Sequence, residues 1–464
     1  MFWRAFVLAA TLAALVTTGA RAEQQDSAAV DDPVTQLRRE IDQLRSDYDQ
    51  RIAALEARLA ELRGAAAEPP ATPPTPPPVT AEATPAPLTI LSGARGKNFL
   101  NLSLDGLFAA GTSTGTDVGA LEPGGHDPAQ RGFTAQNVEV VFEGAVDPYF
   151  RAQANVVLQI SPEGETVVEL EEAYATTSSL PRGLQLKAGQ FFTEFGRLNS
   201  MHPHAWDFVD QPLVNGRFFG PDGLRSVGAR LSWLLPTDFY SEAFLTLQNS
   251  QGETLTSFRS VPGETLFGRE IVERNVSAVS DLLLVPRYTT SFDLTDTQTL
   301  LVGASAALGP NGTGESGRTR IYGVDGYWKW KSPTAFKGFP FLKIQGEVMY
   351  RDLSASAAPE MPEGSAAAAS FSDWGGYLQL NWGYKAGHVL GLRMDKVGGD
   401  SGDPAALALA GRLRLSPVVT WFPTEYSKLR LQYNFDHGDA FEQDEHSLWL
   451  QLEFLLGAHS AHKF

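Results

Sequence analysis

Strict alternation of apolar and polar residues is the feature of this sequence that most limits its fold. The segment at 447–456, SLWLQLEFLL, has an apolar residue at every second position, and so does the segment at 428–436, KLRLQYNFD. Similar segments occur at 151–160 and 342–351, where Arg, Lys, Glu, Gln and Asn fill most of the other positions. Because successive side chains of a strand point to opposite faces, this pattern predicts β-strands with one apolar and one polar face.

These strands fit a membrane barrel better than a soluble sandwich, whose apolar faces pack together in one core. The expected strands are about 9–13 residues long, which suits a tilted crossing of the bilayer. Their polar faces carry charges in one strand after another, as a water-filled lumen requires. Aromatic residues gather near the expected strand ends, for example Trp374, Trp382 and Trp421, as in the girdles at membrane surfaces. Beyond residue 22 there is no apolar run of the ~18–20 residues that a spanning helix needs.

We therefore predict an all-β protein, a closed antiparallel transmembrane β-barrel of about 16 strands in the outer membrane. The expected strands occupy residues 98–109, 133–144, 149–160, 166–177, 183–193, 226–235, 239–249, 280–290, 297–308, 318–331, 341–352, 372–384, 388–396, 409–421, 428–436 and 446–456. Short connections such as 146–148 alternate with long ones such as 194–225. This alternation is typical of outer-membrane barrels, which have short periplasmic turns and long outer loops.

Three segments precede the barrel, which we place at 91–464. Residues 1–22 combine a basic start, an apolar run and an A-x-A motif, and predict a secretory signal peptide. Residues 23–64 have apolar residues at spacings of 3 and 4, which predicts a periplasmic coiled-coil helix that joins subunits. A helix that packs on its own barrel, or acts as a spacer, is the alternative. Residues 65–90 are rich in proline and predict an extended linker.

Composition disfavours several classes of function. The 464 residues carry a formal net charge of −17, which argues against a nucleic-acid partner because a phosphate backbone needs a basic surface. There is no cysteine, and therefore no disulfide, thiolate metal site or cysteine nucleophile. Spacing alone brings no Ser, His and Asp together into a catalytic arrangement. We predict neither an enzyme nor a cofactor.

The loop that contains residues 202–226, HPHAWDFVDQPLVNGRFFGPDGLRS, is irregular and rich in aromatic, Gly, Pro and charged residues. A 16-stranded barrel encloses an aqueous channel. A loop folded into that channel would narrow it, and irregular backbone is tolerated where it lines water. We expect the aromatic residues of the loop to hold it against the barrel wall: Trp206, Phe208, Phe218 and Phe219.

Four segments around this loop follow one another in an informative order. They are LEEAYATT at 170–177, KAGQFFTEFG at 187–196, QPLVN at 211–215 and GPDGLRSVGARLSW at 220–233. Together they resemble the phosphate-selective porin family, the porins O and P, although Glu194 stands where that family usually has proline. The resemblance implies a trimeric diffusion porin.

The charged residues of the loop form the predicted pore constriction: His202, His204, Asp207, Asp210, Arg217, Asp222 and Arg225. The predicted lumen wall carries basic residues at Lys187, Arg230, Arg393, Arg412, Arg414 and Arg430, and carboxylates that include Asp105, Glu139 and Glu171. Opposite charges on facing walls predict a transverse field that orients dipolar solutes. The alternative is that these side chains are hydrated and satisfy one another.

Two residue groups in the loop have competing interpretations. The segment His202-Pro203-His204 with Asp207 is only a partial ligand set for a transition metal, so we favour loop packing and predict no metal. Arg217 and Arg225 either attract anions at the constriction or pair with the aspartates of the same loop, Asp207, Asp210 or Asp222.

The predicted function is passive diffusion of small hydrophilic solutes, including anions such as phosphate, through a homotrimer whose third outer loop forms the constriction. One alternative is a structural anchor, in which the coiled coil tethers the outer membrane to peptidoglycan. Another is a ligand-specific receptor. Energised receptors carry a large folded plug before the barrel, where we predict only a helix and a linker.

Overall fold

The computed structural model describes residues 88–92, 98–273, 275–357, 367–400 and 409–457. The predicted signal peptide and coiled-coil helix, and all but the end of the predicted linker, lie outside these residues. In the described part of the chain, no helix has the length and apolar character needed to cross a membrane.

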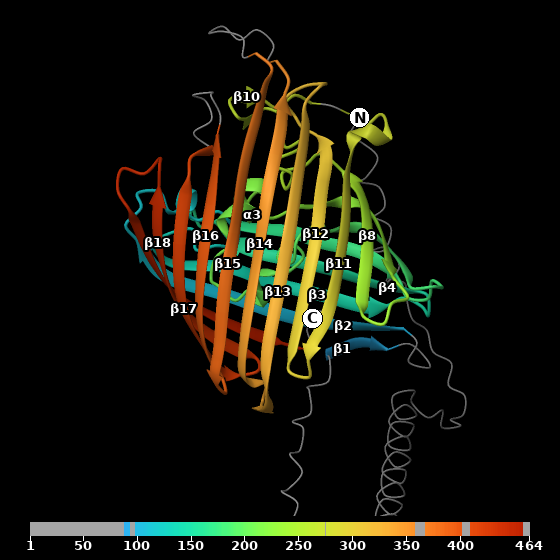
Figure 1. Cartoon of the computed structure of the whole chain (residues 1–464), viewed down its shortest axis with the longest axis vertical. Helices are drawn as coiled ribbons and strands as arrows, with labels where there is room; N and C mark the ends of the chain where they lie inside the picture. Colours follow the sequence, from blue (N-terminus) through green and yellow to red (C-terminus); the bar gives the residue numbers. More distant parts are fainter. Residues whose placement is uncertain (1–87, 93–97, 274, 358–366, 401–408, 458–464) are drawn as a thin grey trace, which may run out of the picture. The chain divides into compact units, whose positions relative to one another are not determined.

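Sixteen antiparallel strands close into a β-barrel (Figure 1). They are β2 (Phe99–Ser113), β3 (Gly132–Ala145), β4 (Phe150–Ile160), β5 (Thr166–Thr177), β6 (Leu184–Phe192), β7 (Arg225–Leu234), β8 (Tyr240–Asn249), β11 (Leu282–Thr295), β12 (Gln298–Pro310), β13 (Arg318–Phe336), β14 (Phe339–Ala355), β15 (Ala369–Lys385), β16 (His388–Asp400), β17 (Arg412–Thr424), β18 (Ser427–Gly438) and β19 (Glu445–Leu456). Strand β8 pairs with β11, and β19 pairs with β2, which closes the ring. The predicted fold class is confirmed, because each predicted strand overlaps one observed strand.

Strand β1 (Leu88–Ser92) is an additional strand, which begins within the predicted linker. It pairs with the start of β2, from Phe99 to Leu102, where the pairing of β19 with β2 has already ended at Leu104. It therefore covers a strand edge that would otherwise be unpaired. The outer loops contain α2 (Val118–Leu121), η1 (Pro203–Ala205), α3 (Leu213–Phe219), β9 (Thr265–Leu266), β10 (Arg269–Glu270) and η2 (Val279–Asp281).

The outward face of the barrel is apolar. On β15 the outward side chains of Trp374, Leu378 and Trp382 are exposed, whereas the inward side chains of Tyr377 and Gln379 are buried. The same alternation places leucine, valine and aromatic side chains on the outside of the other strands. This belt is the surface that contacts lipid.

A charge in the middle of this belt should destabilise the barrel. Leu378 lies midway between Trp374 and Trp382, so we expect Leu378→Arg to lower the free energy of unfolding by ~2–4 kcal/mol, the cost of arginine at the bilayer midplane. Urea unfolding in lipid vesicles, followed by tryptophan fluorescence, measures this change. Tyr384→Arg, near the end of the same strand, is the matched control and should cost only ~0–1 kcal/mol. Equal losses for both variants would contradict this assignment of the belt.

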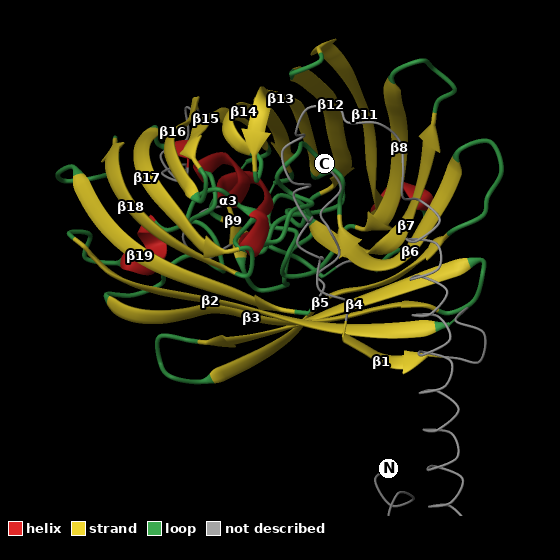
Figure 2. Cartoon of the chain, turned by 90° about the horizontal axis from the view of Figure 1, so that it is seen from below, coloured by secondary structure: helices red, strands yellow, loops and turns green. Residues whose placement is uncertain are grey.

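The interior of the barrel is filled in its outer half. Figure 2 shows loops and helix α3 inside the ring of strands. The third outer loop (residues 193–224) and the fourth (residues 250–281) contribute buried apolar side chains, among them Phe195, Phe218, Phe219, Leu255 and Phe258. These pack on inward side chains of the wall: Leu283, Val285, Ala307, Ile321, Met349, Tyr377 and Val397. The prediction that the inner face is polar and lines water is therefore wrong for the outer half of β11 to β16, because two loops bury apolar side chains there.

Candidate functional site

The third loop leaves the wall at the end of β6 and returns to it at β7. Its two ends meet, because Asn199 Nδ2 donates to the Leu224 carbonyl oxygen (2.9 Å) and Leu224 N donates to Asn199 Oδ1 (2.7 Å). Gly196 has a φ of 60°, and a Cβ at this position would lie 2.0 Å from Glu347 Oε2. Glycine is therefore the residue that allows the backbone to turn here against the carboxylate.

Glu347 on β14 holds the first crossing of the lumen. Its Oε1 accepts hydrogen bonds from the backbone nitrogens of Arg197 (3.1 Å) and Leu198 (2.7 Å), and from the hydroxyl of Tyr377 (2.8 Å). The guanidinium of Arg197 then lies 4.1 Å from the ring centroid of Tyr327 on β13. The loop is thereby fixed to the wall opposite its point of departure.

Asp210 forms the second anchor of the loop. Its buried carboxylate accepts hydrogen bonds from Arg393 Nη2 (2.8 Å) on β16 and Arg414 Nη1 (2.5 Å) on β17. The amides of Gln432 (2.6 Å) and Asn434 (2.9 Å) on β18 donate to it as well. Burial by itself would raise the pKa of Asp210, but the two arginines outweigh burial and lower it. Two predicted lumen-wall arginines therefore bind the loop.

Other residues of the predicted wall also bind loops or neighbouring strands. Arg430 Nη1 donates to the Phe208 carbonyl oxygen (3.0 Å), and Arg412 Nη2 lies 2.8 Å from Asp436 Oδ1. On the other side of the barrel, Glu194 accepts from Lys187 (3.2 Å) and contacts Arg230. The predicted wall residues do point inward. Most of them are buried, however, and bind a loop or a neighbouring strand.

The two arginines of the predicted constriction find other partners than the aspartates of their loop. Arg225 pairs with Glu169 on β5, and Arg217 donates to the carbonyl oxygen of Ala410 (2.6 Å). Burial lowers the pKa of Arg217 to about 10. Asp222, near the end of the loop, is partly buried, and burial raises its pKa.

Asp207 does not join the neighbouring histidines. Its Oδ1 lies 2.5 Å from Lys343 Nζ on β14, and its Oδ2 accepts from Gln379 (3.0 Å) and Asn381 (3.2 Å) on β15. The grouping of Asp207 with His202 and His204 is therefore wrong, because the chain turns at η1 and directs them to different walls. The Asp207 and Lys343 side chains are each more than a fifth exposed, so this pair faces open space in the lumen.

His202 and His204 instead join a buried group that we call the histidine–carboxylate cluster. It consists of His126, His202, His204, Asp105, Glu139, Glu171 and Glu172. A bulge in β5 directs two consecutive glutamates inward, since the pairing with β4 shifts register there. His202 Nδ1 lies 2.8 Å from Glu171 Oε2 and 3.3 Å from Glu139 Oε1, and its Nε2 lies 2.9 Å from Glu172 Oε2.

The other two histidines extend this cluster on either side. His204 Nδ1 lies 3.2 Å from Glu139 Oε2 and 3.4 Å from Asp105 Oδ2. His126, in the first outer loop, lies 3.3 Å from Glu171 Oε1. Burial by itself would lower the pKa of each histidine, but the carboxylates outweigh burial and raise the pKa of His126 and His204 to about 9.

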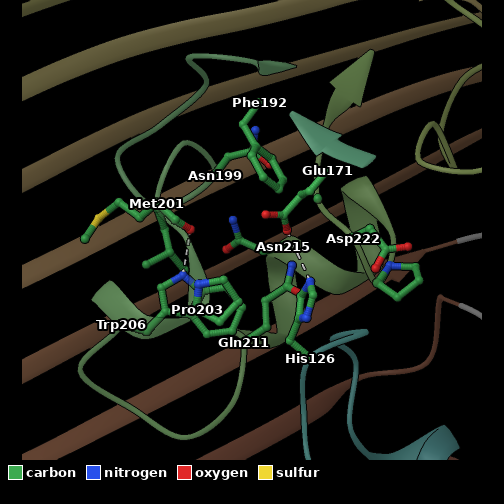
Figure 3. Close-up of a pocket in the computed structure, with 13 residues that line it drawn as sticks. His126, Glu171, Phe192, Asn199, Met201, Pro203, Trp206, Gln211, Asn215 and Asp222 are labelled. Carbon is green, nitrogen blue, oxygen red and sulfur yellow. Dashed lines mark hydrogen bonds and ion pairs between the residues drawn. The ribbon is translucent and has the colours of Figure 1, made fainter. Parts of the chain in front are cut away.

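A small cavity lies beside the cluster (Figure 3). Its volume is about 20 Å³, which is room for about one water molecule. His126 and Glu171 line it and face each other, together with Gln211 and Asn215 of the third loop. His126 and Glu172 were missed from the sequence, because the first lies in a distant loop and the second depends on the bulge.

Comparison with known proteins gives one relative and a shared fold. No protein family model matches the sequence. A protein of Aquifex aeolicus described as uncharacterized is 31% identical over 367 residues, covering 74% of this chain and 73% of the relative. The outer membrane channel DcaP of Acinetobacter baumannii superposes with a TM-score of 0.51 at 12% identity, covering 79% of this chain and 100% of that one. OmpF of Salmonella typhi gives a TM-score of 0.47 at 10% identity, covering 79% of this chain and 100% of that one.

Proposed function

The chain belongs to the same family as the Aquifex aeolicus protein and is an outer-membrane β-barrel, and on this basis we propose that it is a porin for small hydrophilic solutes. The observation that carries the proposal is the third loop, which crosses the lumen of a 16-stranded barrel and is bonded to the wall on several sides. A loop held in this way narrows a wide barrel without unfolding when solutes pass.

Within this proposal, the passage lies beside the third loop and its charged lining selects solutes. Asp207, Lys343 and Arg197 keep partial exposure at the inner side of the loop. His202, His204, Asp210 and Arg225 hold the loop in place from buried positions, whereas Arg217 and Asp222 are partly buried. The constriction is therefore shaped by the buried residues and charged by the exposed ones.

A preference for anions, with phosphate as one candidate, is the finer part of the proposal. Lys329 on β13 stands directly opposite Lys343 on β14, and both side chains face the lumen at partial exposure. Like charges at directly opposite positions destabilise a sheet. A lysine pair that is present in spite of this cost suits a wall that attracts anions. Glu143 lies on β3, eight strands from β13 around the ring, and its side chain is also partly exposed. The two walls would orient dipolar solutes.

The apolar cluster in the outer half supports a second candidate. Side chains such as Phe218 and Phe258 are completely buried against the wall, so loops 3 and 4 fill part of the outer half of the lumen. A barrel of this kind is also suited to a ligand-specific receptor, or to an anchor that reaches peptidoglycan through the predicted helix.

Assembly as a homotrimer remains part of our proposal, and chemical cross-linking of the protein in outer membranes tests it.

Single-channel recording in planar bilayers separates these candidates. A porin gives stepwise conductance in KCl without any added ligand, and a KCl gradient gives a reversal potential with the sign of an anion-preferring channel. Folded barrels that insert but give no steps would rule out passive diffusion. They would favour the receptor or the anchor.

Neutralising Lys343 should shift the channel toward cations. In Lys343→Gln the partly exposed Asp207 loses its cationic partner, which stands 2.5 Å away. Because the sign of charge at a constriction sets ion preference, we expect the reversal potential in a KCl gradient to move toward that of K⁺. Lys396→Gln, which removes the same charge from the outward face of β16, is the control and should leave the potential unchanged. Identical potentials for wild type and Lys343→Gln would contradict a passage at this site.

A further inference from the structure

We propose that the histidine–carboxylate cluster binds a divalent first-row transition metal, with Zn²⁺ as the probe, which fastens the third loop to the barrel wall. The ligands would be Asp105, Glu139 and Glu171 from three strands, and His202 and His204 from the loop. This site is separate from the passage beside Lys343, and the inference does not depend on conduction.

The spacing of the donor atoms fits a metal ion. Two overlapping sets, Asp105–Glu139–His204 and Glu139–Glu171–His202, each offer three ligand atoms within 4.8 Å of one another. Bonds of ~2.0–2.1 Å to a tetrahedral ion place neighbouring donors roughly 3.3–3.4 Å apart. Three of the observed nitrogen–oxygen distances, from His202 and His204 to Glu139 and Asp105, are 3.2 to 3.4 Å. Glu139 belongs to both sets, so it would either bind one ion or bridge two.

The carboxylate oxygens of the cluster have unused capacity to accept. Among the described residues, both oxygens of Asp105, both of Glu171 and Oε2 of Glu139 are buried and accept no hydrogen bond of normal geometry. Imidazole nitrogens lie 2.8 to 3.4 Å from four of these five oxygens, and most of these distances also suit ligands around a common centre. Buried polar atoms of this kind are rare without a partner or an ion.

The second ring nitrogen of His202 has the kind of partner that metal-binding histidines commonly have. In His202, Nδ1 faces Glu139 and Glu171, while Nε2 lies 2.9 Å from Glu172 Oε2. Histidines that bind metal through one nitrogen commonly donate the other N–H to a carboxylate, which fixes the tautomer. Asn155 Nδ2 donates to Glu139 Oε1 and orients that carboxylate as well.

Charge also favours a cation here. Asp105, Glu139 and Glu171 are each completely buried, and burying uncompensated carboxylates is costly. A divalent ion bound between these carboxylates would supply the compensating charge, with the histidine ligands neutral. Mixed imidazole and carboxylate ligands suit Zn²⁺, Mn²⁺ and Fe²⁺ better than Ca²⁺ or Mg²⁺, and the cavity beside Glu171 has room for a water ligand.

Metal titration of the full-length protein tests the proposal. The folded barrel in detergent is treated with EDTA, dialysed and titrated with ZnCl₂ by calorimetry, and bound zinc is counted by mass spectrometry. We expect at least one Zn²⁺ per chain. Glu139→Gln, which removes the shared ligand, should weaken binding by at least about a hundredfold. Glu172→Gln, which removes the carboxylate beside His202 Nε2, should weaken it by about 10–100-fold.

His437→Gln is the matched control, because His437 and Asp444 form an exposed histidine–carboxylate contact at 2.7 Å. It should leave Zn²⁺ binding unchanged. Co²⁺ added to the wild type gives a second readout that needs no variant, since a four-coordinate Co²⁺ ion with nitrogen and oxygen ligands absorbs strongly in the visible range. No zinc or cobalt bound to the folded wild type would overturn the proposal. So would Zn²⁺ binding that Glu139→Gln leaves intact, or that His437→Gln reduces as much.

Discussion

Deletion of residues 200–223 should raise the single-channel conductance several-fold. The structure gives the design, because Asn199 and Leu224 already meet through two hydrogen bonds of 2.9 and 2.7 Å. Two glycines can therefore replace the deleted residues without moving β6 or β7. The deletion removes the Asp210 anchor, helix α3 and both histidines of the loop, so the cross-section of the lumen widens. Planar-bilayer recording of purified protein measures the step size.

Removal of Glu442 and Gln443 provides the control for this deletion. Both are exposed in the outer loop between β18 and β19, so the step size should not change. Equal conductance of wild type and the 200–223 deletion would show that another part of the lumen limits flow. Folded deletion protein that still gives no steps would support the anchor or receptor instead.

Replacement of Asp210 by alanine should release the middle of the third loop. The substitution leaves Arg393 and Arg414 buried without the carboxylate that both contact at 2.5 to 2.8 Å. Arg393 keeps Asp395 as a partner and Arg414 keeps Glu122 and Asp436, so the cost is that of the lost hydrogen bonds to a charged group, ~1.5–3 kcal/mol each. We expect local opening to increase by about a hundredfold or more, since ~1.4 kcal/mol corresponds to a factor of ten.

Hydrogen exchange of the loop amides measures this opening. In the wild type, Val209 N donates to Gln432 Oε1 (2.8 Å) and Leu213 N donates to Asp395 Oδ1 (3.2 Å), so both amides are protected. They should exchange much faster in Asp210→Ala, while amides in the strands stay protected. Asp352→Ala, which breaks the exposed pair with Arg320, should cost only ~0–1 kcal/mol. Unchanged exchange in Asp210→Ala would show that the other anchors hold the loop without it.

The sequence was sufficient for the wall of the barrel. Alternation with a period of two is a local property, so each strand could be recognised from about ten neighbouring residues. The alternation of short and long connections then identified the inner and outer ends, and with them the loop at 194–225. Three of the four aromatic residues expected to hold that loop do pack, since Phe208, Phe218 and Phe219 are completely buried or nearly so. Trp206 is only partly buried and donates to the Met201 carbonyl oxygen of its own loop.

The contacts inside the barrel could not be read in the same way. Asp210 and Arg414 are 204 residues apart, and the inward direction of Arg414 does not say which carboxylate it meets. Asp207 was grouped with His202 and His204 because they are close in sequence, yet they bind different walls. The apolar inner face near Ile321 and Val397 was not predicted, because its partners lie in two distant loops.

The sequence by itself thus determined the strands, their number, the apolar exterior and the place of the long loops, because each depends on residues near one another in the chain. Only the tertiary structure decided what those loops touch. Closing the ring brings β2, β3 and β5 to one side of the third loop and β14 to β18 to the other. That closure assembles the Asp210 anchor and the histidine–carboxylate cluster from residues that no local pattern connects.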